Sequence, residues 1–195
     1  MSTEEKQLLE LLKQRSFKRG TFQLASGGVS DYYIDGRTSA VYSEAVPLIG
    51  EVLYQRTKDL PDIDAIGGLE VGAVPLTAAV VFSYHLHGRK MEGFWVRDEI
   101  KRHGTQKLIE GNLAKGSRVV IVDDVFTKGT SAAKAVKAVR DFGCEVIAVC
   151  ALVDRLQGAE ELFKNMGIGN YHPVFTIRDF GVEVESGNAT RKNSK

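Results

Sequence analysis

The stretch Arg118-Val-Val-Ile-Val-Asp-Asp-Val-Phe-Thr-Lys-Gly-Thr-Ser131 decides the fold class of this chain. Its apolar part, residues 119–122, is continuous and β-branched, which predicts a strand buried on both faces, as in a parallel sheet. Asp123 and Asp124 follow at the carboxyl end of that strand, and a short loop leads into a helix pattern at residues 132–139. Ligands of open α/β sheets bind beyond the carboxyl ends of the strands. The stretch therefore predicts a strand, a ligand-binding loop and a helix.

The loop at residues 127–131 has the composition of a phosphate-binding loop. It offers backbone N–H groups, hydroxyl groups and a conformationally permissive glycine, Gly129. The helix N-terminus behind it carries unsatisfied N–H groups and a partial positive charge, which suit a phosphate monoester. The alternative is an ordinary strand–turn–helix with an N-cap at Thr130 or Ser131.

The two carboxylates need a different partner, because they would repel a phosphate. We expect them to accept hydrogen bonds from ribose hydroxyls or to approach a divalent cation. Successive strand residues point to opposite faces, so Asp123 and Asp124 can share one role only if the chain turns there.

Composition excludes several classes of function. A chain of 195 residues with 43% hydrophobic content can bury one good core, so we expect a single domain, residues 1–195. The net charge is +1 with both signs interspersed, which gives no electrostatic case for nucleic acid or a membrane as partner. No long apolar span and no secretory-type N-terminus is found, so we expect a cytoplasmic location.

The two cysteines, Cys144 and Cys150, fall on or beside an expected buried strand. Their even spacing places them on the same face, too far apart along one strand to bridge, and we expect reduced, buried thiols. No Cys/His spacing suggests zinc. His85 and His87 point about 160° apart on a helix, so an interaction with the helix C-terminus is expected rather than a metal site.

Strand and helix patterns alternate along the chain, which predicts an α/β fold with a central, mainly parallel sheet flanked by helices. Ser2 and Glu5 form a possible capping box for a first helix, and Ser43 is the expected cap of a second. The other expected elements are strands near 63–67, 91–96, 145–153 and 173–178, and helices near 75–86 and 158–166. Residues 186–195 are polar and expected to fray.

Residues 94–111 form a second informative segment. A strand is followed by a long polar connection that carries Arg97, Lys101, His103 and Lys107. Long connections of this kind in compact α/β domains are often lids. Cations on a closing loop would stabilise the charge that builds on a pyrophosphate leaving group and would exclude water. The alternative is a solvated, charged hairpin.

These segments carry a resemblance to known enzymes. Residues 118–131 resemble the 5-phosphoribosyl-1-pyrophosphate (PRPP) signature of the type I phosphoribosyltransferases. Residues 97–104, Arg-Asp-Glu-Ile-Lys-Arg-His-Gly, resemble the lid loop of the orotate phosphoribosyltransferases. Residues 22–35, 67–75 and 152–158 resemble that family's N-terminal segment, pyrophosphate-binding loop and D-R-x-x-G turn. The matches run in order from about residue 8 to about residue 180.

The resemblance implies the type I phosphoribosyltransferase fold. Its small N-terminal hood would come mainly from about residues 1–42 with C-terminal contributions, and its core from about residues 43–180. The implied reaction is transfer of the 5-phosphoribosyl group from PRPP to orotate, giving orotidine 5′-monophosphate and pyrophosphate in UMP biosynthesis. Mg²⁺ is the implied cofactor. Family members are usually homodimers, with the lid loop reaching the neighbouring active site.

The resemblance also implies residue roles. Lys101 and His103 would be catalytic, closing over the pyrophosphate. No direct protein ligand of Mg²⁺ is assigned, since the ion would arrive through PRPP with Asp123 and Asp124 nearby. The residues expected to bind PRPP are Arg97, Lys101, His103, Asp123, Asp124, Val125, Phe126, Thr127, Lys128, Gly129, Thr130 and Ser131. Those expected to contact orotate are Thr127, Arg155, Tyr32 and Tyr33, and the expected pyrophosphate loop is Leu69, Glu70, Val71 and Gly72.

Some of these roles have alternatives. Arg155 suits the orotate carboxylate because a guanidinium can engage it in a bidentate way, but an ion pair with Asp154 or Asp179 is possible. On a strand only one of Tyr32 and Tyr33 can face the pocket, and the other would be core.

Three positions depart from the family pattern. Many members have lysine where this chain has Ala25, Gly72 or Asp98. Each change removes a cation from the surroundings of pyrophosphate, and Asp98 adds an anion unless its side chain points away. Glu70 is a further anion, which could lie toward Mg²⁺ or its waters.

Two other functions stay open from sequence. One is a regulator of the same fold that binds PRPP or a nucleotide without chemistry; the Lys101 and His103 loop and the lack of an added DNA-binding helical module argue against it. The other is a related transferase for a different base; Arg155 and the paired tyrosines favour an acidic pyrimidine.

Overall fold

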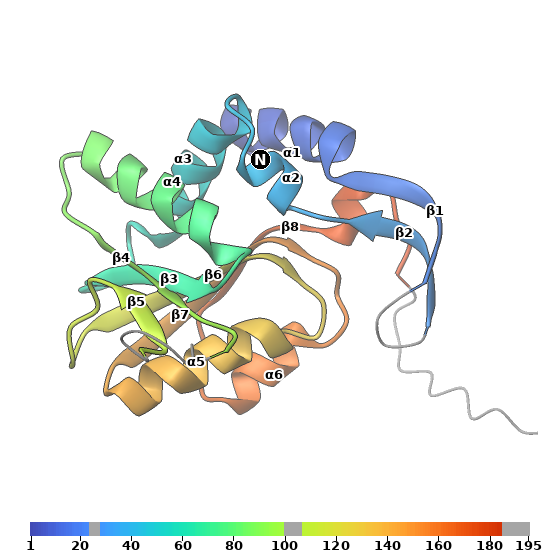
Figure 1. Cartoon of the computed structure of the whole chain (residues 1–195). Helices are drawn as coiled ribbons and strands as arrows, with labels where there is room; N and C mark the ends of the chain where they lie inside the picture. Colours follow the sequence, from blue (N-terminus) through green and yellow to red (C-terminus); the bar gives the residue numbers. More distant parts are fainter. Residues whose placement is uncertain (24–27, 100–106, 185–195) are drawn as a thin grey trace, which may run out of the picture.

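A six-stranded sheet forms the centre of the computed structural model, which describes residues 1–23, 28–99 and 107–184. The strand order is β5-β4-β3-β6-β7-β8, and every neighbouring pair is parallel except β4 with β5 (Figure 1). The strands are β3 Ala65–Leu69, β4 Glu92–Val96, β5 Ile109–Gly111, β6 Arg118–Phe126, β7 Glu145–Asp154 and β8 Tyr171–Thr176. The predicted α/β fold with a mainly parallel sheet is confirmed.

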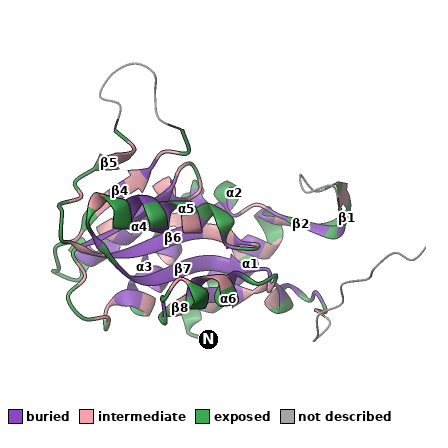
Figure 2. Ribbon diagram, turned by 90° about the horizontal axis from the view of Figure 1, so that it is seen from below, coloured by how far each residue is buried: buried purple, intermediate pink, exposed green. Residues whose placement is uncertain are grey.

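Helices cover both faces of the sheet (Figure 1). One face carries α1 Thr3–Arg15, α2 Arg37–Ala40, α3 Ala45–Thr57 and α4 Ala73–Leu86, and the other carries α5 Thr130–Phe142 and α6 Ala159–Asn165. The central strands β6 and β7 are buried along most of their length, as Figure 2 shows. This burial on both faces explains the continuous apolar runs seen in the sequence.

A second sheet has only two strands, β1 Phe17–Gln23 and β2 Val29–Ile34, which pair antiparallel and lie to one side of the main sheet (Figure 1). We call this ribbon the hood. The 3₁₀ turn η1 Ile177–Phe180 lies against it, with the rings of Phe17 and Phe180 5.3 Å apart. The C-terminal part of the chain therefore holds the N-terminal ribbon in place.

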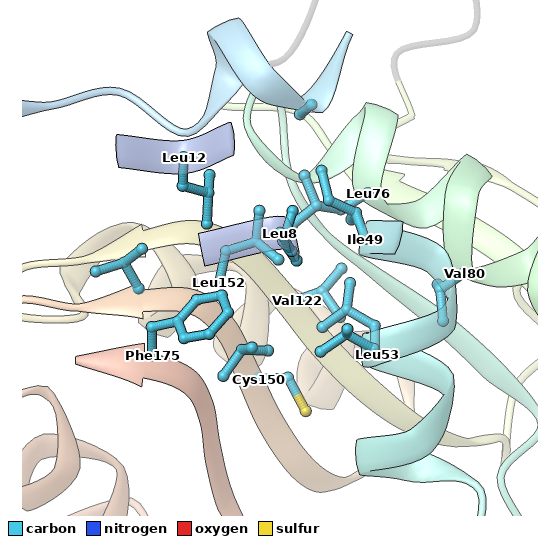
Figure 3. Packing of buried hydrophobic residues seen from close by; sticks show 14 of the residues in the cluster. Leu8, Leu12, Ile49, Leu53, Leu76, Val80, Val122, Cys150, Leu152 and Phe175 are labelled. Atoms are coloured by element: carbon cyan, nitrogen blue, oxygen red, sulfur yellow. The ribbon is translucent and has the colours of Figure 1, made fainter. Parts of the chain in front are cut away.

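The larger core cluster joins α1, α3 and α4 to the sheet (Figure 3). Leu8 and Leu12 of α1 are four residues apart, so they share one helix face, and both are fully buried. They meet Ile49, Leu53, Leu76, Val80, Val122, Cys150, Leu152 and Phe175.

Helix starts confirm one predicted cap and contradict another. Glu5 N donates to Ser2 Oγ at 3.1 Å and Ser2 N donates to Glu5 Oε2 at 2.9 Å, so the capping box is present. Ser43 does not cap the second long helix: α3 begins at Ala45, and its N-cap, Glu44, makes no side-chain cap bond. The backbone N–H groups of Ala45 and Val46 donate instead to the Tyr42 carbonyl oxygen at 3.0 and 2.9 Å, so the start of α3 is satisfied without the Ser43 side chain.

The prediction that Cys144 and Cys150 share a face is wrong. The pairing of β6 with β7 shifts by one residue between Val146 and Ala148, which is a β-bulge. An extra residue reverses the alternation, so Cys144 packs in the cluster with α5 and Cys150 in the cluster with α3. Both thiols are buried and free, as expected.

Other expectations have simple outcomes. The last predicted strand ends at Thr176, and Ile177 opens the 3₁₀ turn instead. His87 is the C-cap of α4, stacks on Tyr54 and pairs with Glu51, Nε2 to Oε2 at 2.8 Å. Within the described ranges no group of three His, Cys, Asp or Glu side chains could hold a metal ion, and no helix is long and apolar enough to cross a membrane.

Candidate active site

A pocket of about 280 Å³ opens where β3, β6 and β7 end and the hood begins. Its lining combines the sheet ends with β2 and the turn after it. The lining residues are Tyr33, Ile34, Asp35, Arg37, Leu69, Glu70, Val71, Gly72, Asp123, Asp124, Val125, Thr127, Ser131 and Arg155. The structure thus brings together side chains from four separated parts of the sequence at the position where open α/β sheets bind ligands.

The acidic pair lies at the centre of this pocket. Asp123 is 7% exposed, and its Oδ1 accepts the backbone N–H of Asp124 at 3.0 Å. Both carboxyls line the pocket, although neighbouring strand positions ordinarily face opposite ways. Burial raises the pKa of both, and the charge of Asp124 raises the pKa of Asp123 further. Two buried carboxylates side by side favour a ligand that brings hydroxyl donors or a cation.

The loop after β6 has the geometry expected for phosphate binding. Thr127 and Ser131 line the pocket, and α5 begins at Thr130. Gly129 is the N-cap, so Thr130 and Ser131 are not; its φ is 74°, and an added Cβ would lie 3.0 Å from the Phe163 ring. Glycine is required there for both reasons.

Three other residues of the signature differ in exposure. Lys128 and Thr130 are exposed, whereas the Phe126 side chain is 1% exposed and packs on Phe163. Phe126 can therefore contact a ligand through its backbone only. Its carbonyl oxygen already accepts the backbone N–H of Arg155 at 2.8 Å.

The loop after β3 presses against the acidic pair. The peptide between Glu70 and Val71 is cis. A Cβ added to Gly72 would lie 2.8 Å from Asp124 Oδ1 and 2.9 Å from Asp123 Oδ1. No side chain fits at position 72 while the two carboxylates keep their places.

The hood supplies the opposite wall. Tyr33 lines the pocket and is 41% exposed, whereas Tyr32 is 6% exposed and does not line it. This confirms that alternation gives the two tyrosines different environments.

Arg155 is held by the hood rather than by a carboxylate. It is 8% exposed; its Nε donates to Tyr32 Oη at 3.0 Å and its Nη2 to Ser30 Oγ at 3.4 Å. Arg155 forms neither of the two alternative ion pairs. Asp154 instead accepts the Leu156 backbone N–H, and Asp179 caps η1.

Asp35 and Arg37 are site residues that the sequence pattern did not indicate. Arg37 Nε and Nη2 each donate to Asp35 at 2.8 Å, which lowers the pKa of Asp35. Both line the pocket, and a Cβ added to Gly36 between them would lie 2.8 Å from Asp124 Cβ. The available signal was the Asp-Gly-Arg turn that follows the tyrosine pair after one residue, Ile34.

The lid residues are only partly described. Arg97 lies between Glu70 (Nη2 to Oε1, 4.0 Å) and Glu110 (Nη1 to Oε1, 3.7 Å). Asp98 pairs with Lys134 on α5 at 2.7 Å, so its carboxylate is directed to that helix. Lys101 and His103 fall in residues 100–106, and Ala25 in residues 24–27, outside the described residues.

Comparison with known proteins identifies relatives of this chain. The sequence model of the phosphoribosyl transferase domain matches residues 41–169. Orotate phosphoribosyltransferase of Sorangium cellulosum is 39% identical over 184 residues, 92% of this chain and 94% of the relative. That of Streptomyces coelicolor is 44% identical over 155 residues, 80% of this chain and 85% of the relative.

Solved structures give the same result. The crystal structure of Mycobacterium tuberculosis orotate phosphoribosyltransferase in complex with PRPP superposes with a TM-score of 0.77 at 37% identity, covering 92% of this chain and 99% of the other. The chain therefore belongs to the phosphoribosyltransferase family, within its orotate phosphoribosyltransferase branch.

Proposed function

We propose that the chain transfers the 5-phosphoribosyl group of PRPP to orotate, giving orotidine 5′-monophosphate and pyrophosphate in pyrimidine biosynthesis. The observation that carries this proposal is the joint lining of one pocket by a phosphate loop, an acidic pair and a buried arginine. Relatives about 40% identical over most of the chain carry the same name, and the Mycobacterium tuberculosis enzyme has been crystallised with PRPP.

The pocket suggests how PRPP binds. Thr127 and Ser131, with backbone N–H groups at the start of α5, would hold the 5′-phosphate. Asp123 and Asp124 would accept hydrogen bonds from the ribose hydroxyls, which compensates two buried carboxylates. The loop of Leu69, Glu70, Val71 and Gly72 lies next to them and would face the pyrophosphate.

Orotate would occupy the side of the pocket nearest the hood. Arg155 would engage its carboxylate, Tyr33 would form a wall for the ring, and Thr127 would contact it from the phosphate loop. The site then holds the two substrates against each other, so that an orotate nitrogen faces the anomeric carbon of PRPP.

The reaction we propose is a displacement at that carbon through an oxocarbenium-like state. The bond to pyrophosphate breaks while the bond to nitrogen forms, so negative charge builds on the leaving group. Arg97, Lys101 and His103 are the residues we assign to that charge, with closure of the lid excluding water. Arg97 would exchange Glu70 and Glu110 for the pyrophosphate.

Mg²⁺ is the cofactor we propose. The acidic pair fits a cation nearby, and the ion would arrive on PRPP rather than be held by protein alone. When bound, the ion would stabilise charge on the pyrophosphate oxygens. We also propose a cytoplasmic homodimer in which each lid reaches the neighbouring site.

One assay tests the function. The chain is mixed with Mg²⁺, PRPP and orotate, and the loss of orotate absorbance is followed. We expect turnover with orotate and none with uracil or a purine base. Turnover only with another base would assign a different transferase, and binding of PRPP without turnover of any base would assign a regulator.

A further inference from the structure

Arg155 is a buried cation whose side-chain partners are neutral. Its guanidinium bonds to two hydroxyls, and none of the described carboxylates forms an ion pair with it. A buried charge without a counter-charge is costly, so this arrangement suits a residue whose anion arrives with a ligand. Arg155 also lines the pocket, so a ligand can reach it.

Both hydroxyls come from one face of β2. The burial pattern of Val29–Ile34 alternates, which puts Ser30, Tyr32 and Ile34 on the inner face of the hood. Ser30 Oγ donates to the Tyr32 carbonyl oxygen at 2.7 Å and accepts the Tyr32 backbone N–H at 3.4 Å, so it meets Arg155 Nη2 as an acceptor. The Tyr32 ring stacks near Phe17, with centroids 5.9 Å apart, and lies under the guanidinium at 4.6 Å.

The hydrogen bonds leave one edge of the guanidinium available. Arginine has five N–H donors in a planar fork. Tyr32 and Ser30 take the edge formed by Nε and Nη2, whereas Nη1 makes no hydrogen bond to the described residues. The end formed by Nη1 and the second N–H of Nη2 therefore remains for two parallel bonds to a carboxylate.

We infer that Tyr32, supported by Ser30, is a positioning residue that fixes Arg155 with its free end directed to the carboxylate of orotate. This inference rests on the proposed function, and it adds a role for the hood: its inner face orients the residue that reads the acidic group of the base. Tyr33, the next residue on the strand, forms the wall of the pocket, so the two tyrosines act on the same substrate in different ways.

The test is the Tyr32→Phe variant, which keeps the ring and removes only the hydroxyl. The guanidinium then loses the partner of its Nε and can rotate, so the KM for orotate rises about tenfold. The KM for PRPP stays within about twofold, because Tyr32 hydrogen-bonds to none of the described residues assigned to PRPP. Ser30→Ala shifts the KM for orotate in the same direction by about two- to threefold.

Tyr42→Phe is the matched control. Tyr42 lies under another guanidinium, that of Arg15 at 3.7 Å, and is not part of the pocket. Removing its hydroxyl leaves both KM values unchanged. A second control is a double-mutant cycle. In the Arg155→Lys variant, which lacks the planar guanidinium, adding Tyr32→Phe changes the KM for orotate by less than about twofold.

Three results would overturn the inference: an unchanged KM for orotate in Tyr32→Phe, an equal rise of both KM values, or full additivity with Arg155→Lys. Each is measured against wild-type turnover with orotate. If the wild-type chain does not turn over orotate, the proposed function fails; if it does and Tyr32→Phe behaves like wild type, only the positioning role fails.

Discussion

At the scale of single residues, the site is built around two carboxylates whose burial is energetically unfavourable. Asp123 and Asp124 are buried next to each other, and Gly36 and Gly72 let two loops come so close that any side chain would collide with the pair. A side chain at position 72 would therefore require the two carboxylates to move. Arg37 supplies a positive charge close to this pair. It interacts with both Asp35 and Asp124, and its pKa is raised mainly by the hydrogen bonds to Asp35.

Asp123→Asn tests the cost of this placement. Folding raises the pKa of Asp123 above the ordinary 3.8, so the folded state binds the proton more tightly than the unfolded state. Stability from this group is therefore present at low pH and is lost as pH rises through the folded pKa. We expect the amide, which keeps the oxygen that accepts the Asp124 N–H, to raise the Tm at pH 7 and to bring no gain below about pH 4.

Activity should move in the opposite direction. The amide is a weaker acceptor for the ribose hydroxyls, so kcat/KM for PRPP falls about tenfold or more. Thermal melts from pH 3 to pH 8, with parallel assays of activity near pH 7, check both parts. A Tm gain that is independent of pH would mean that the carboxyl is not destabilised by its burial.

At the scale of elements, the site depends on how strands pass into loops. β6 carries the acidic pair and ends in the phosphate loop, while the turn after β7 carries Arg155, and parallel pairing brings these ends to one edge of the sheet. α5 has a left-handed glycine at each end, Gly129 at the N-cap and Gly143 at the C-cap. Substituting these two glycines in turn separates an effect on phosphate binding from an effect of backbone strain.

Gly129→Ala and Gly143→Ala form a matched pair. Both positions have positive φ, 74° and 99°, so each substitution should destabilise the fold by about 1 kcal/mol. Only Gly129 has a neighbour that an added Cβ would meet, the Phe163 ring at 3.0 Å, while Gly143 has open space. We expect Gly129→Ala alone to raise the KM for PRPP, by about tenfold, as the phosphate loop shifts.

Steady-state kinetics at saturating orotate, together with urea unfolding, separate the two effects. Equal KM values for the two variants would show that the loop does not bind the phosphate. Unequal losses of stability would show that Phe163 adds strain beyond the backbone conformation.

At the scale of the whole molecule, the site is shared between the sheet and the hood, and we propose that a second chain completes it. The hood reaches the pocket because Phe17 packs on Phe180 of η1 and Arg19 donates to the Gly181 carbonyl oxygen, which ties the N-terminal ribbon to the C-terminal turn. Contacts between residues 163 and 162 positions apart thus help to place Tyr33 and Arg155 at one pocket. The proposed lid adds Lys101 and His103 from the neighbouring subunit.

Mixing two inactive variants tests the lid. Lys101→Ala removes the lid cation, and Arg155→Ala removes the group for the orotate carboxylate, so each variant alone should be nearly inactive. If the lid serves the neighbouring site, refolding the two at equal amounts restores about a quarter of wild-type activity, since half the dimers are mixed and each has one intact site.

No restoration would place the lid over its own chain's site or exclude the dimer. Size-exclusion chromatography of the mixture distinguishes these two outcomes. The Asp98→Ala variant serves as a control with a loop change but no catalytic role, because Asp98 pairs with Lys134 on α5.

Local sequence determined a large part of this protein. The β-branched run before Asp123 produced a buried strand, the Gly-Thr-Ser segment produced a helix start, and Ser2 with Glu5 produced a capping box. Each of these depends on bonds and contacts within a few residues, so the chain encodes them without reference to distant parts. The alternation that separates Tyr32 from Tyr33 is local in the same sense.

Tertiary structure decided the features that need two distant segments. The bulge opposite Val119 and Val120 put the cysteines on different faces, because register depends on the partner strand as well as on the sequence of β7. Asp35 and Arg37 joined the site, and Arg155 took hydroxyl partners instead of Asp154 or Asp179, because the hood closes over the ends of the strands. Such contacts form only when packing brings the segments together. Alternation along a strand determines which way a side chain points, but not which distant residue it meets.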